Sequence, residues 1–158
     1  MSDTGHTVKS YAEEMQSLND DLIKMGSLTE SQLADAMEAV IKLDKESVDK
    51  IVQNDSKINA LRAAIDNQIT TVLVKRAPMA VDLRITISTM KISHDLERIG
   101  DLAKSVAKKV TPLPIDLPDE LVNSLRRLGD LVQKQLKDVL DAYLNNSKDK
   151  AIEIWRKD

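Results

Sequence analysis

The stretch RAPMAVDLRITISTMKISHDLERIGD, residues 76–101, decides the fold because it holds a helix break followed by a long helical pattern. Pro78 disfavours helical geometry at the residue before it, so one helix must end near residue 75. The next helix is expected from Pro78, in its first turn, to about Val110. Its β-branched residues recur every seven positions, the spacing of a seam in a helical bundle: Ile85, Ile92, Ile99 and Val106. Leu96, Ala103 and Val110 repeat in the same way.

Helical periodicity predicts further helices on both sides of this stretch. Apolar residues at spacings of three and four run from about Val8 to Leu43, and we expect this helix to continue through Gly26, since no turn cluster accompanies the glycine. Other helices are expected over about 47–75 and 118–145, and another from about 147. The short link near residues 43–46 predicts that the first two helices are antiparallel neighbours.

Composition narrows the class of protein. The 158 residues contain four glycines, no phenylalanine and no cysteine, which favours an all-α fold and excludes disulfides and thiolate metal sites. The net charge is −3 and no basic stripe is present, so we expect no nucleic-acid partner. No apolar run approaches a membrane span and the N-terminus lacks a signal-peptide pattern, which predicts a cytoplasmic protein without direct membrane insertion.

The sequence also repeats itself. When it is shifted by 103 residues, 11 of the 38 pairs between 18–55 and 121–158 are identical, including Gly26 with Gly129. We interpret this as a duplicated three-helix unit, complete at 8–111, with a linker at 112–117 and a partial second repeat at 118–158. We expect the full protein to have about 210–240 residues, because the second unit lacks its later helices.

Two acids on the third predicted helix, Glu97 and Asp101, are four residues apart and therefore share a face, with Cβ atoms roughly 6 Å apart. At 100° per residue they point away from the apolar core. Asp55 and Asn59 lie at similar spacing on the second helix. Oxygen ligands of this kind suit Mg²⁺, Mn²⁺, Ca²⁺ or iron.

The same residues also fit a solvated charged face without metal. Arg62 is placed to bridge Asp55 and Asp66 on the second helix. His94, one turn before Glu97, fits a surface or interface histidine better than a ligand. Methionines at helical spacing fit core positions.

Two motif blocks carry a resemblance: Arg76–Arg84 and Asp95–Asp101 are similar to those of the PhoU family of phosphate-transport regulators. The resemblance covers nearly the whole chain, and further segments fit it: Lys24–Gly26 through Gln32–Leu33, Asp55–Asn59, Asp138–Ala142 and Ala151–Asp158. It implies an all-α fold of three-helix bundle repeats, with the first repeat complete and the second partial.

The resemblance also implies a function. Family members damp phosphate uptake and the phosphate-starvation response, and they are often homodimers. The partners implied here are the ATPase subunit of the phosphate ABC transporter and a phosphate-sensing histidine kinase. Their metal motifs fall here on Glu97, Asp101, Asp55 and Asn59, with a divalent metal or iron implied. Arg62 departs from the pattern, because an acid is frequent at that position. The resemblance implies a second acidic motif at positions beyond residue 158.

We therefore expect a regulatory binding protein, not an enzyme, with no catalytic residues, since no nucleophile–base pair or Gly-rich phosphate loop appears. One alternative is a carboxylate-bridged di-iron oxidoreductase, which needs paired Glu-x-x-His motifs. The sequence offers His94-x-x-Glu97, once and in reverse order. Another alternative is a structural helical bundle without metal. The exposed apolar stripe expected on the fourth helix predicts homo-oligomerisation or swapping.

Overall fold

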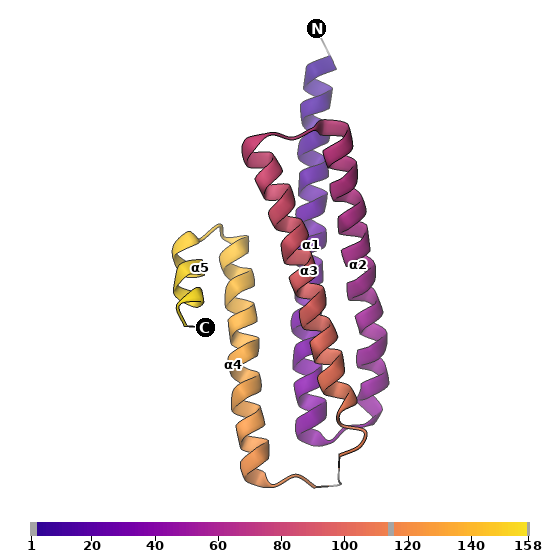
Figure 1. Cartoon of the computed structure of the whole chain (residues 1–158), viewed down its shortest axis with the longest axis vertical. Helices are drawn as coiled ribbons and strands as arrows, with labels where there is room; N and C mark the ends of the chain where they lie inside the picture. The colour runs from indigo at the N-terminus through magenta and orange to yellow at the C-terminus, as the bar shows by residue number, and fades with distance from the viewer. Residues whose placement is uncertain (1–2, 114–115, 158) are drawn as a thin grey trace.

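The structure, a computed structural model, describes residues 3–113 and 116–157. These residues form the helices α1 (Asp3–Lys42), α2 (Glu46–Arg76), α3 (Ala80–Lys108), α4 (Asp119–Leu144) and α5 (Lys148–Trp155). The first three pack as an antiparallel bundle, α4 lies along α1, and α5 folds back on α4 (Figure 1). The predicted all-α fold is confirmed, with α1–α3 as the complete three-helix unit and α4–α5 as the partial one. None of the described helices is apolar over a stretch long enough to cross a bilayer.

α1 runs without a break through Gly26, as predicted. It ends where Leu43 adopts a positive φ of 52°, and α2 begins three residues later. The carboxylate of Asp44 accepts hydrogen bonds from the backbone N–H groups of Glu46 and Ser47 at 3.0 and 3.2 Å. These bonds satisfy the free donors at the start of α2, so the tight antiparallel turn is stabilised locally.

The connection between α2 and α3 confirms one prediction and corrects another. Ala77, the residue before Pro78, leaves helical geometry with φ 42° and ψ 56°, so α2 ends as expected. Pro78, however, does not open the next helix, because Met79 is extended and α3 starts at Ala80. The chain reverses direction over residues 77–79, and a helix can resume only after that reversal.

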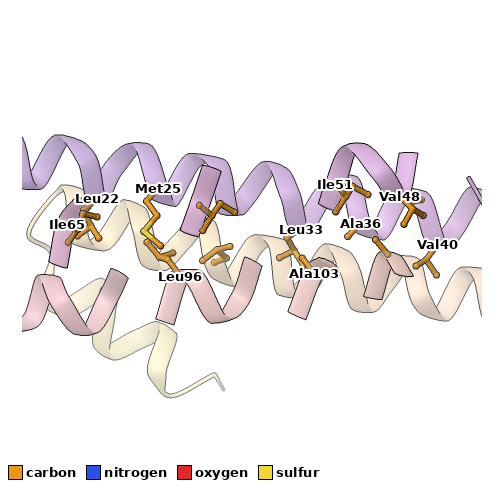
Figure 2. Close-up of a cluster of buried hydrophobic side chains, with 14 of the residues drawn as sticks. Leu22, Met25, Leu33, Ala36, Val40, Val48, Ile51, Ile65, Leu96 and Ala103 are labelled. Atoms are coloured by element: carbon orange, nitrogen blue, oxygen red, sulfur yellow. The ribbon is translucent and has the colours of Figure 1, made fainter. Parts of the chain in front are cut away.

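The core of the bundle is a continuous cluster of aliphatic side chains between α1, α2 and α3 (Figure 2). α2 contributes isoleucines at 51, 58, 65 and 69, each at most 2% exposed. Burying an aliphatic side chain of this size stabilises the fold by about 1.5–3 kcal/mol. The buried residues of α1 include the following: Leu18, Leu22, Met25, Leu33, Ala36 and Ala39.

The buried face of α3 differs from the predicted seven-residue seam. Ile85 and Val106 are 45% and 39% exposed, although Leu96, Ala103 and Val110 are buried as predicted. Besides Leu96, the buried positions of α3 carry small or hydroxyl-bearing residues: Thr86, Thr89, Ser93, Gly100, Ala103 and Ala107. The hydroxyls donate to carbonyls one turn earlier, so they need no other partner in the core. The prediction was wrong here because it followed the large residues, whereas close helix packing selected the small ones.

α4 packs against α1 through two matching glycine contacts. A Cβ at Gly26 of α1 would lie 3.0 Å from Leu140 of α4, and a Cβ at Gly129 of α4 would lie 2.8 Å from Met37 of α1. The shift of 103 residues that relates the two repeats converts Gly26 into Gly129 and Met37 into Leu140. The same contact is therefore made twice across a pseudo-twofold axis, which supports the internal repeat.

Candidate functional site

The α2 and α3 residues singled out in the sequence face each other across one side of the bundle, together with Lys104, which was not predicted. We call this set the α2–α3 strip: Asp55, Asn59, Arg62, Asp66, His94, Glu97, Asp101 and Lys104. It forms because α2 and α3 are antiparallel neighbours, so residues early in α2 lie beside residues late in α3. Of the four predicted metal ligands, the structure brings Asp55, Asn59 and Asp101 into one network, and Glu97 lies one turn earlier on α3.

Asp55 is the centre of this network and is only 4% exposed. Its Oδ1 accepts from Gln32 Nε2 at 3.1 Å, and its Oδ2 accepts from Asn59 Nδ2 at 3.3 Å and from Lys104 Nζ at 2.6 Å. A buried carboxylate requires such donors, because its charge is costly to remove from water without them. Residues of three helices, α1, α2 and α3, therefore converge on this one side chain.

Lys104 joins the two helices electrostatically. Its Nζ lies 2.5 Å from Asp101 Oδ1 as well as 2.6 Å from Asp55 Oδ2. The hydrogen bonds to Asp101 and Asp55 raise the pKa of Lys104 above its usual value, despite the opposing effect of partial burial. The ammonium therefore stays charged between the two carboxylates.

Gln32 on α1 completes the network from inside and was not among the predicted site residues. It is 1% exposed, and its Nε2 also donates to the Gly100 carbonyl at 2.9 Å. Gly100 itself allows α3 to lie close to α2, since a Cβ there would lie 3.1 Å from Ile58 Cδ1, whereas its distance of 3.6 Å from Gln32 Nε2 would be an ordinary contact. A polar residue inside the apolar stripe of α1 was the signal in the sequence that could have found it.

The other end of the strip is more exposed. Arg62 donates to Asp66 at 3.0 Å, which confirms one half of the predicted bridge, while Asp55 is held by Lys104 instead. His94 Nε2 lies 3.2 Å from Asp66 Oδ1, with the His94 side chain half-exposed. This position agrees with the expected surface histidine.

Glu97 and Asp101 lie away from the apolar core, as the helical geometry predicted, but not in open solvent. Both are half-buried at the boundary between α2 and α3, and Asp101 keeps 46% of its side chain exposed. Glu97 makes no ion pair within the described part of the chain. The two acids of the motif therefore differ, since one is paired and the other is available.

The fit of a metal ion can be judged from these contacts. Among residues 3–113 and 116–157, no three His, Asp or Glu side chains are grouped closely enough to hold a metal. Between Asp55 and Asp101, the position of a bridging cation is taken by the Lys104 ammonium. The described arrangement does not fit a resident metal, and metal binding at Glu97, Asp101, Asp55 and Asn59 stays a prediction.

Comparison with known proteins shows which family and which relatives the chain is similar to. Residues 22–110 match the family model described as the PhoU domain. The chain is 40% identical over 156 residues to the "Phosphate-specific transport system accessory protein PhoU homolog" of Caulobacter vibrioides, covering 98% of this chain and 68% of the relative. A protein of the same name from Clostridium acetobutylicum is 34% identical, with 96% and 70% covered.

Solved structures agree with this placement. The chain superposes on the crystal structure of PhoU from Pseudomonas aeruginosa with a TM-score of 0.81 and 34% identity, covering 90% of this chain and 69% of that one. For the phosphate transport system regulatory protein PhoU from Streptococcus pneumoniae, the TM-score is 0.84 and the identity 32%, with 93% and 69% covered. The fold and the sequence therefore point to the same relatives.

Proposed function

Because this chain belongs to the PhoU family, we propose that it takes part in phosphate transport as a negative regulator of phosphate uptake and of the phosphate-starvation response. The support is the match over 98% of the chain to a relative named as an accessory protein of the phosphate-specific transport system. The repeat division, 8–111, 112–117 and 118–158, is part of this proposal, because α1–α3 pack around one core, α4 packs against α1 and adds Leu136 to that core, and α5 packs on α4.

The proposed partners are the ATPase subunit of the phosphate ABC transporter and a phosphate-sensing histidine kinase. An accessory protein acts by contact, and the α2–α3 strip offers a surface of charged groups held in place by ion pairs. Charged surfaces of this kind set partner choice and association rate more than affinity. We place the action on the cytoplasmic side, where the ATPase subunit of an ABC transporter is accessible.

The experiment that tests this function uses a strain lacking the chain's gene, with a phosphate-starvation reporter in phosphate-rich medium. Loss of the gene should raise the reporter signal, and expression of the unaltered chain should return it to the starting level. An unchanged reporter in the deletion strain would refute negative regulation.

A charge reversal then tests the surface. Glu97→Arg should weaken capture by the purified ATPase subunit by about tenfold, the size expected for about 1.4 kcal/mol lost at an interface. Glu13→Arg is the matched control, because Glu13 is exposed on α1, outside the strip, and changes the net charge equally. Equal effects of both variants would remove the strip from the proposed interface.

We also propose that the chain associates with a second copy through α4. The side of α4 away from α1 exposes Leu128 by 56% and Leu131 by 66%, with Val132 and Val139 beside them. An apolar face of this kind on a single helix favours association. Light scattering at micromolar concentration should give a dimer mass, which Leu131→Glu should reduce to that of a monomer.

A further inference from the structure

The end of the α2–α3 strip that contains Asp55 and Asp101 also contains a cationic side chain, Lys104. Asp55 and Asp101 belong to different helices, and each lies within 2.6 Å of the same Lys104 Nζ. Two carboxylates brought to one point repel each other unless a positive charge lies between them. Lys104 is 22% exposed at its side chain, so this charge is shielded from solvent more than a surface lysine would be.

The ligand positions of Asp55 are also occupied. Gln32 binds one of its oxygens, and Asn59 and Lys104 bind the other. A divalent ion bound by protein oxygens needs several of them at about 2.0–2.6 Å. To bridge Asp55 and Asp101 such an ion must displace Lys104, because the Lys104 ammonium is bound to both carboxylates.

We propose that Lys104 is the resident cation of this acidic site, and that its ammonium holds α2 and α3 together in the place where a divalent metal would otherwise lie. The site then binds a divalent cation tightly only when Lys104 is removed, with Asp55 and Asp101 as ligands and Glu97 as the nearby unpaired acid. Gln32 supports the site from inside through its Nε2, which donates to Asp55, while its buried Oε1 has no hydrogen-bond partner among the described residues.

The test is a Mn²⁺ titration of the full chain by calorimetry, using Lys104→Gln and unaltered protein. We expect Lys104→Gln to bind one Mn²⁺ per chain at least about tenfold more tightly than the unaltered chain, a change of about 1.4 kcal/mol. Lys91→Gln is the control, because Lys91 is exposed on the same helix and its loss changes the net charge equally. Equal affinities in all three proteins, tight binding by the unaltered chain, or no binding by any of them would overturn the proposal.

A second measurement needs no substitution and so does not depend on the variant folding. Limited acetylation of the unaltered chain, read by peptide mass spectrometry, should label Lys104 at least about tenfold more slowly than Lys91, since an amine bound to two carboxylates is rarely free to react. Adding millimolar Mn²⁺ should leave the Lys104 rate unchanged. Fast labelling of Lys104, or a rise in its rate with Mn²⁺, would show that the ammonium is not the resident cation.

Discussion

The helices of the α1–α3 bundle and those of the α4–α5 arm have the same amphipathic sequence pattern, but they bury very different numbers of residues. α2 buries seven of its residues, whereas the almost equally long α4 buries three, and these are Gly129, Leu136 and Ala142. α2 packs along two long helices, α1 and α3, whereas α4 packs along one long helix, α1, and the eight-residue α5. Periodicity therefore predicts a helix and the side that it prefers to bury, but the length of the neighbouring helices decides how much of that side is buried.

The largest expected effect compares one aliphatic residue from each region. Ile58→Ala in α2 should lower the free energy of unfolding by about 2–5 kcal/mol, because Ile58 is fully buried and leaves a cavity. In the monomer, at concentrations too low for copies to associate, Leu131→Ala in α4, 66% exposed within one chain, should change it by less than about 0.5 kcal/mol. Urea unfolding followed by circular dichroism measures both. Similar losses would mean that the arm is as well packed as the bundle.

The next comparison concerns a charge in each region. Asp55→Ala should cost about 2–3 kcal/mol, because Lys104 and Gln32 lose their acceptor. Asp138→Ala in the arm should cost less than about 0.5 kcal/mol, since its contact with Lys150 is 3.8 Å long and exposed.

A double variant sharpens this result. Asp55→Ala combined with Lys104→Met should lose less stability than the two single variants added together, because removing both partners leaves no unpaired charge. Additive losses would argue that Asp55 and Lys104 are not coupled.

The junction of the two regions depends on the glycine contacts between α1 and α4. Gly26→Leu should cost about 1–3 kcal/mol, because its side chain would overlap Leu140 and push α4 away from α1. Hydrogen exchange should then accelerate in α4 while α2 stays protected. Lys24→Leu, at an exposed position of α1, is the control and should leave α4 exchange unchanged.

The smallest effect concerns pH. The hydrogen bonds from Arg76 hold the pKa of Glu14 below its ordinary value near 4.5, and Lys157 lowers the pKa of Glu153 in the arm. A lowered folded-state pKa stabilises the fold above about pH 4.5, and that contribution is lost as the pH falls through the folded value. Glu14→Gln should therefore destabilise the chain by about 1 kcal/mol or less at pH 7.

The difference between Glu14→Gln and the unaltered chain should shrink as the pH falls below 4.5 and vanish in stronger acid. Thermal unfolding from pH 7 to pH 3 measures it. Glu153→Gln should change stability less at every pH, since Glu153 and Lys157 are both exposed. A larger effect in the arm than in the bundle would contradict the comparison.

Much of the site could be predicted, and the missing parts share one cause. The spacing of Glu97 and Asp101 correctly predicted that both residues lie on one face of α3. The spacing of Asp55 and Asn59 likewise predicted that these two residues share a face of α2. Lys104 and Gln32 were missed, because their roles depend on which side chains of neighbouring helices they reach. The seam of α3 was misassigned for the same reason, since only the neighbours show that small residues face inward.

The sequence by itself determined the all-α class, the helix order, the unbroken α1 and the repeat, because these depend on local propensity and on periodicity along one chain. Only the tertiary structure decided that Asp55 is buried, that an ammonium lies between two acids, and that Gly26 and Gly129 make equivalent contacts. Those features depend on distances between residues far apart in the chain, and such distances are set by how whole helices pack together.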